Sequence, residues 1–71
     1  MKKAERAAYI RKKAREMAAT GEYSGWLIIE QMLRFRHGLH EARTVLDEQY
    51  IRRELDETCR RAQEGRAPPG S

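Results

Sequence analysis

Large hydrophobic residues are densest in the segment 23–36, YSGWLIIEQMLRFR. At about 100° per residue, the spacing of an α-helix, this segment forms two neighbouring apolar stripes. One stripe holds Trp26, Ile29 and Leu33, and the other holds Ile28, Met32 and Phe35. Because a surface helix has a narrower apolar face than these two stripes make together, we predict that this helix is contacted from two directions. It should form the centre of a small helical bundle.

Polar residues indicate where this central helix begins and ends. Ser24 is a favourable N-cap residue, and Glu30 lies four residues before Arg34, the favourable order for an ion pair across one turn. Gly38 follows the last apolar position and suits a left-handed C-cap. We therefore expect a helix that is capped by Ser24, supported by a Glu30–Arg34 pair, and ended near Gly38.

The segment 1–19 contains no glycine or proline and is rich in strong helix formers, so it predicts a helix. Its inward positions are mostly small: Ala7, Ile10, Ala14, Met17 and Ala18. Small side chains bury little area, so we expect this helix to dock weakly or to be completed by a second copy of the chain. Thr20 and Gly21 should end it.

The remaining pattern predicts a short helical segment at residues 39–46 and a longer helix at residues 47–64; a bend between them is favoured, and one continuous helix is the alternative. The inner stripe of the longer helix is Ile51, Leu55, Cys59 and Ala62, and its expected ion pairs are Glu48–Arg52, Asp56–Arg60 and Glu57–Arg61. No strand pattern occurs. The predicted fold is all-α, a small bundle of three main helices plus a short helical segment, forming a single helical domain at residues 1–64 with a disordered C-terminal tail at 65–71.

The size of the chain bears on its oligomeric state. At 71 residues, a single hydrophobic core is marginal, so we expect self-association, with a homodimer favoured. The candidate interface residues are Trp26, Leu27, Ile10 and Met17. Leu27 is the most direct candidate because it lies outside both apolar stripes of the central helix.

Positive charge is concentrated at the start of the chain. The net charge is +4, and residues 1–19 carry seven basic and two acidic residues. The candidate nucleic-acid contacts are Lys2, Lys3, Arg6, Arg11, Lys12, Lys13 and Arg15. Clustered cations neutralise phosphates and release counterions, but these residues surround the helix instead of forming one stripe, which a purely solubilising role also explains. A helix-turn-helix built from residues 28–36 and 39–46 is a further alternative.

Catalytic and metal chemistry have little support in the sequence. A metal site needs three or four ligands, and His37 with His40 is one close pair interrupted by a glycine. The single cysteine, Cys59, lies at a core-spaced position, excludes an intramolecular disulfide, and fits a reducing compartment. We expect no enzyme activity, no metal and no cofactor. No apolar run of about 18 residues occurs, so we expect no membrane partner and a cytoplasmic location.

These observations assign the chain to no family and identify no reaction. The favoured interpretation is a non-enzymatic protein-interaction or regulatory module that forms homo-oligomers or binds an unidentified protein. The alternative is a small nucleic-acid-binding protein that uses its basic N-terminal helix.

Overall fold

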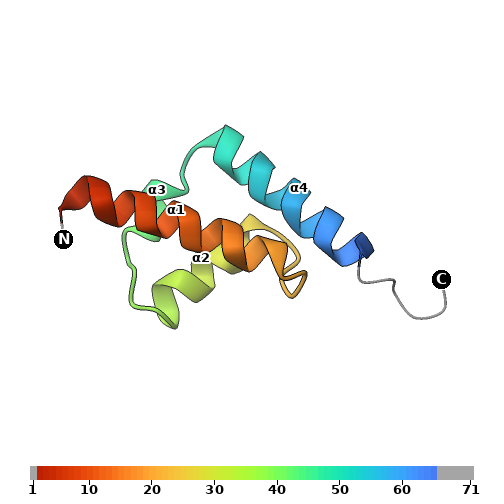
Figure 1. The fold of residues 1–71 in the computed structure, drawn as a ribbon. Coiled ribbons are helices and arrows are strands. Elements are labelled where there is room, and N and C mark those ends of the chain that lie inside the picture. The colour runs from red at the N-terminus through yellow and green to blue at the C-terminus, as the bar shows by residue number, and fades with distance from the viewer. Residues whose placement is uncertain (1, 66–71) are drawn as a thin grey trace.

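The computed structural model describes residues 2–65, and over this range the chain is all-α, as predicted. Three longer helices and one short helix follow in order: α1 (Lys3–Ala19), α2 (Trp26–Phe35), α3 (Ala42–Val45) and α4 (Gln49–Gly65) (Figure 1). A bend separates α3 from α4, as expected. Gly65, predicted to begin the tail, is the last residue of α4. The rest of the predicted tail lies outside the described residues.

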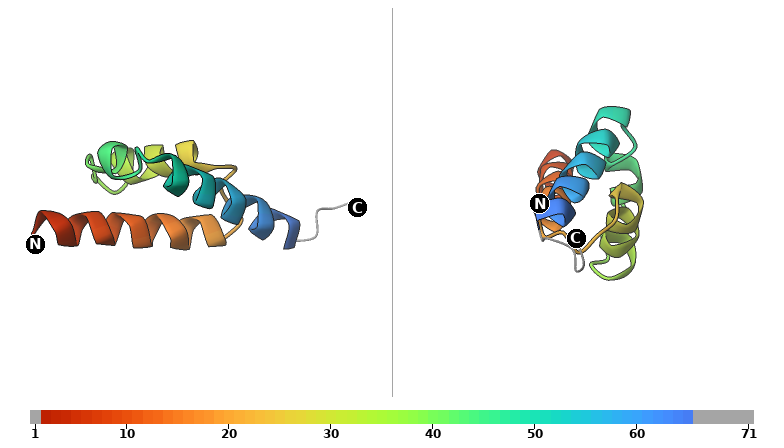
Figure 2. Two further views of the ribbon diagram at one scale, coloured as in Figure 1. Left: turned by 90° about the horizontal axis from the view of Figure 1, so that it is seen from above. Right: turned by 90° about the vertical axis from the view of Figure 1, so that its right-hand side faces the viewer.

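Helix α1 lies across the other three helices and contacts each of them. Figure 2 shows α1 in one layer and α2 with α3 in a second layer, while α4 slants from the second layer toward the C-terminal end of α1. The prediction that α1 docks weakly was wrong, because Ile10, Ala14 and Ala18 are fully buried. Small alanine side chains let the neighbouring backbones approach closely, so a face with little apolar area is still a tightly packed face.

The hydrophobic core draws residues from all four helices and from Leu46, just after α3. Its members are Ile10, Ala14, Met17, Ala18, Ile29, Leu33, Ala42, Leu46, Ile51, Leu55 and Cys59. The predicted inner positions Ile51, Leu55 and Cys59 of α4 are therefore confirmed. Alternating large and small side chains from α1 and α4 meet in this core, and these two helices form the most extensive helix pair.

Helix α2 is covered on one side. Ile29 and Leu33 of the first predicted stripe are fully buried, but Ile28 and Phe35 of the second stripe are 40% and 74% exposed. Helices α1, α3 and α4 all contact α2, and its buried residues lie on one face. The prediction that α2 is covered along both stripes was therefore wrong for Ile28 and Phe35, whereas Met32 of the second stripe is partly buried against the core.

The N-terminus of α2 is capped from another helix. Ser24 makes no capping hydrogen bond; instead the backbone N–H of Trp26 donates to Oδ1 of Asp56 on α4 at 2.9 Å. A Cβ atom at Gly25 would lie 2.8 Å from the same carboxylate oxygen, so a larger residue here would push the Asp56 side chain away from the Trp26 N–H. The expected Asp56–Arg60 ion pair is absent from residues 2–65 because Asp56 is turned toward α2.

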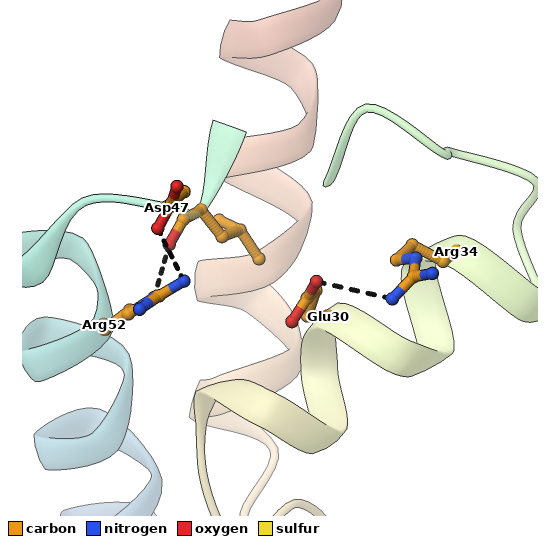
Figure 3. A network of polar contacts seen from close by, with 5 residues as sticks. Glu30, Arg34, Asp47 and Arg52 are labelled. Atoms are coloured by element: carbon orange, nitrogen blue, oxygen red, sulfur yellow. Dashed lines mark hydrogen bonds and ion pairs between the residues drawn. The ribbon is translucent and has the colours of Figure 1, made fainter. Parts of the chain in front are cut away.

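Arg52 joins the turn before α4 to α2. Its Nε donates to the backbone oxygen of Leu46 at 3.1 Å, and its Nη2 donates to Oδ1 of Asp47 at 2.8 Å (Figure 3). The guanidinium also lies 4.1 Å from the centre of the Trp26 ring. Arg52 therefore bonds the α3–α4 turn in place of the expected pair with Glu48, and it covers the half-buried indole by a cation–π contact.

Two glycines end helices as the sequence predicted. Gly21 follows α1 with a φ angle of 78°, and Gly38 follows α2 with a φ angle of 67°. Both lie in the left-handed region that residues with a Cβ atom rarely adopt. The turn at Gly21 begins the connection that lets α2 pack back against α1, and the turn at Gly38 begins the connection from α2 to α3.

Candidate interaction surface

An apolar surface follows the side of α2 that faces away from the core. We call it the outer α2 face and define it by Leu27, Ile28, Gln31 and Phe35, with the partly buried Met32 at the edge that packs against the core. At about 100° per residue these five positions lie within roughly 140° of one another. None of the five carries a charge. The face therefore presents a contiguous uncharged strip along the length of α2.

The exposure of this strip is large for apolar side chains. Leu27 is 49% exposed, Ile28 40% and Phe35 74%. Tyr9 on α1 and Tyr50 on α4 are the other large hydrophobic residues exposed in residues 2–65, and each stands alone on its helix. Isolated exposed hydrophobic residues are normal on protein surfaces, whereas a contiguous apolar patch of roughly 300 Å² or more is often functional. The outer α2 face is a contiguous patch of this kind.

A polar edge borders the outer α2 face. Arg34 pairs with Glu30 at 3.6 Å across one turn, as predicted, and Figure 3 shows the two side chains reaching toward each other along α2. Glu30 is 6% exposed, so this carboxylate is held largely within the fold. The Arg34 guanidinium also lies 5.0 Å from the centre of the Phe35 ring. An apolar centre with a charged rim is the usual anatomy of a protein–protein interface.

The four predicted interface residues fall in different environments. Leu27 lies on the outer α2 face. Trp26 is half-buried against the core and beneath Arg52. The interface prediction was wrong for Ile10 and Met17. Their side chains are 0% and 6% exposed, because α1 packs fully against the chain's own helices. A folded chain does not present these two residues to a partner.

Sequence reasoning placed only Leu27 of the outer α2 face at an interface and missed its other exposed apolar members, Ile28 and Phe35. Ile28 and Phe35 have the spacing of a buried stripe, seven residues apart, and were assigned to the core for that reason. Helical periodicity identifies a face but not the element that covers it. The signal that could have found them is the total apolar width of α2, which exceeds what neighbours on one side of the helix can cover.

The basic residues of α1 divide into paired and unpaired groups. Arg6 forms an ion pair with Glu41, just before α3, and Nε of Arg15 lies 2.7 Å from Oε1 of Glu54 on α4. The hydrogen bond from Arg6 lowers the pKa of Glu41 below its usual value. Five predicted nucleic-acid contacts form no ion pair within residues 2–65: Lys2, Lys3, Arg11, Lys12 and Lys13.

A shallow cavity of about 120 Å³ lies on the outer surface of α1 and is lined by Tyr9, Lys12, Lys13 and Glu16. Tyr9 is 47% exposed, so an aromatic ring lies beside two unpaired lysines. The neighbouring Glu16 carboxylate reduces the positive potential of this cavity. Of the predicted nucleic-acid contacts, this cavity therefore brings together only Lys12 and Lys13.

The helix-turn-helix alternative is not supported by the observed helices. Helix α3 spans only four residues, a single turn, where a recognition helix in this motif must enter the major groove. The segment 39–41, expected to begin that helix, is a turn. The structure therefore corrects this alternative.

The cysteine and histidine side chains also have defined surroundings. Cys59 is fully buried, and burial raises the pKa of its thiol, with a further contribution from the charge of Asp56. A raised thiol pKa lowers the fraction of reactive thiolate. His37 and His40 are exposed. In the described range, no three or more His, Cys, Asp or Glu side chains are placed to hold one metal ion.

No protein-family model, curated protein or solved structure matches this chain. Across residues 2–65, each helix is too short or too polar to cross a membrane. The candidate surface is therefore defined by the geometry and chemistry of the chain itself.

Proposed function

We propose that this protein is a non-enzymatic interaction module that self-associates through the outer α2 face, with a homodimer as the favoured form. The observation that carries the proposal is the contiguous exposure of Leu27, Ile28 and Phe35 on one uncharged helix face. Removing such a face from water is favourable in proportion to the apolar area buried. A second chain, or another protein with an apolar surface, supplies that burial.

The size of the outer α2 face sets the expected strength of association. Three partly exposed side chains present roughly 300 Å² of apolar area, compared with about 800 Å² per partner in a standard interface. Small interfaces of this kind are typical of weak or transient complexes. We expect a dimer whose population changes with protein concentration, which suits a regulatory module better than a permanent assembly.

The proposed role is compatible with the surroundings of the reactive side chains. The buried Cys59 lies in the core, where it packs as a small hydrophobic residue. A single free cysteine is stable as a thiol in a reducing compartment, so we propose the cytoplasm as the location of the protein.

The substitution Leu27→Glu tests the proposed function. Glutamate at this position adds a charge that must be desolvated, or opposed by a second glutamate, when the faces meet, so we expect self-association to weaken by at least about tenfold. Light scattering coupled to size-exclusion chromatography, over a range of loading concentrations, measures the change in average mass. Gln49→Glu is the matched control, because it adds the same charge at an exposed position on α4. Equal behaviour of the two variants would contradict the proposal.

Nucleic-acid binding by α1 is the second candidate function. The observation that favours it is the position of Tyr9 beside Lys12 and Lys13, which form no ion pair in residues 2–65. Proteins that bind single strands combine a cationic surface with aromatic rings on which bases stack. This arrangement is smaller than a usual binding groove and includes Glu16, so we rank it below self-association.

Salt dependence separates the two functions. If α1 binds nucleic acid, the affinity for a single-stranded oligonucleotide should fall steeply between about 50 and 200 mM salt, and the double substitution Lys12→Glu with Lys13→Glu should abolish binding. Apolar self-association should instead not weaken as salt rises over this range. Fluorescence anisotropy of a labelled oligonucleotide gives the affinity. Binding that persists in the double variant, or that ignores salt, would contradict a phosphate-binding role for these lysines.

A further inference from the structure

The two most exposed apolar residues of the outer α2 face, Leu27 and Phe35, are equally spaced about Gln31. Leu27 lies four residues before Gln31 and Phe35 four residues after it. Four residues advance a helix by about 6 Å, so one apolar side chain lies about a turn above the amide and another about a turn below it. Both flanking residues are prominent, with Leu27 49% and Phe35 74% exposed.

We propose, resting on the proposed function, that the occupant of the outer α2 face is a second copy of the same chain, and that the two α2 helices pack antiparallel about a two-fold axis at Gln31. In a two-fold interface, if residue i contacts residue j, then j contacts i. The equal spacing on either side of Gln31 satisfies this condition: Leu27 of each chain meets Phe35 of the other.

The charge distribution leaves the outer α2 face as the surface on which two copies can meet. The chain has a net charge of +4, with a net +5 over residues 1–19, so two copies repel each other across much of their surfaces. The outer α2 face is uncharged and allows identical chains to approach without opposing like charges. A strongly acidic partner, by contrast, would be attracted to α1.

The side chain of Gln31 is also suited to self-pairing. Its amide has two N–H donors and one carbonyl acceptor, so two glutamines facing each other across a two-fold axis can exchange hydrogen bonds. A buried polar group without a partner is costly, and this exchange removes the cost. A lysine or glutamate at this central position would instead face its own charge.

Electrostatics select the antiparallel arrangement over the parallel one. Arg34 and Arg36 lie at the C-terminal end of α2. A parallel pair would place these residues directly opposite their own copies. In the antiparallel pair, the two Arg34 residues are separated by about 9 Å along the helix axes, and the two Arg36 residues by about 15 Å, at 1.5 Å per residue from the axis at Gln31. At physiological salt these separations are comparable to or beyond the screening length.

Cysteine cross-linking of the full chain tests the symmetry. The native Cys59 is fully buried, so it contributes little background. Packed helices are 8–10 Å apart, which brings facing Cα atoms within disulfide range. Under mild oxidation, Gln31→Cys should form a covalent dimer with itself. Leu27→Cys and Phe35→Cys should each fail to self-link but should link to each other when mixed. Arg60→Cys, at an exposed position on α4, is the control for random collisions.

The expected yield from Gln31→Cys, and from the mixed pair, is at least about tenfold above the Arg60→Cys control, because colliding monomers meet in random orientations. Self-linking of both Leu27→Cys and Phe35→Cys would show a parallel pair; it would overturn this inference and leave self-association standing. The same holds if Gln31→Cys fails to link in samples that light scattering shows to be dimeric. Wild-type chains that remain monomeric at every concentration would overturn the proposed function as well.

Discussion

Leu33→Ala is expected to remove most of the stability of the folded chain. Leu33 is fully buried in the core, where α2 meets its neighbours. Truncating a buried leucine costs about 2–5 kcal/mol, through lost transfer free energy and the cavity that remains. A domain of this size rarely draws more than about 3–5 kcal/mol from a single core. The variant should therefore be largely unfolded at room temperature.

Phe35→Ala is the matched control for Leu33→Ala. The two positions are two residues apart on α2, but Phe35 is 74% exposed. Its truncation removes a larger side chain and should change the free energy of unfolding by no more than about 0.5 kcal/mol, as for other surface substitutions. Urea unfolding followed by far-UV circular dichroism, at a concentration low enough to keep chains monomeric, measures both. Equal losses of stability would mean that both stripes of α2 are buried, contrary to the structure.

Exchanging charges between the two ends of the outer α2 face should convert the homodimer into a heterodimer. We expect Leu27→Glu and Phe35→Lys chains each to associate poorly, because an unpaired charge faces an apolar residue at both contacts. When the two variants are mixed, the antiparallel arrangement places the new glutamate opposite the new lysine and a native leucine opposite a native phenylalanine. The heterodimer should therefore be favoured over either homodimer by about tenfold or more in the dissociation constant.

Native mass spectrometry distinguishes the heterodimer from the homodimers by mass. A second mixture, Leu27→Glu with Leu27→Lys, is the control, because these two positions lie at opposite ends of an antiparallel interface and do not meet. If this control mixture forms the better heterodimer, position 27 faces its own copy and the helices are parallel. If neither mixture forms dimers while the wild type does, the contact lies elsewhere on the chain.

The sequence predicted the helices well because their signals are local. The apolar spacing of Ile51, Leu55 and Cys59 fixed the inner face of α4, and Gly21 and Gly38 marked the ends of α1 and α2 by the left-handed backbone they adopt. The Glu30–Arg34 pair likewise depends only on one turn of helix. Each of these features is decided by residues within a few positions of one another.

Features that depend on contacts between distant segments could not be predicted in the same way. The carboxylate that caps α2 comes from Asp56, 30 residues further along the chain, and Arg52 left its expected partner for Leu46, Asp47 and the Trp26 ring. The docking of α1 depends on how closely alanine allows α4 to approach. Periodicity contains no information about these distances.

Sequence alone could identify one part of the outer α2 face, and the other part depended on contacts between distant segments. Leu27 lies outside both apolar stripes, and this alone suggested exposure. Ile28 and Phe35 required knowledge of where α1, α3 and α4 lie, because their spacing is compatible with a buried face. Ile10 and Met17 were assigned to an interface because α1 was expected to dock weakly or to be completed by a second copy, whereas in the fold they are buried against the chain's own helices.

Sedimentation equilibrium of the wild-type chain, from low micromolar to millimolar concentration at about 0.1 and 0.5 M salt, tests the central claim most directly: the outer α2 face binds a second copy. We predict an average mass that rises from one chain toward two and is not reduced by salt, because the contact is apolar. A mass of one chain at every concentration would contradict the account, as would a dimer that dissociates at high salt.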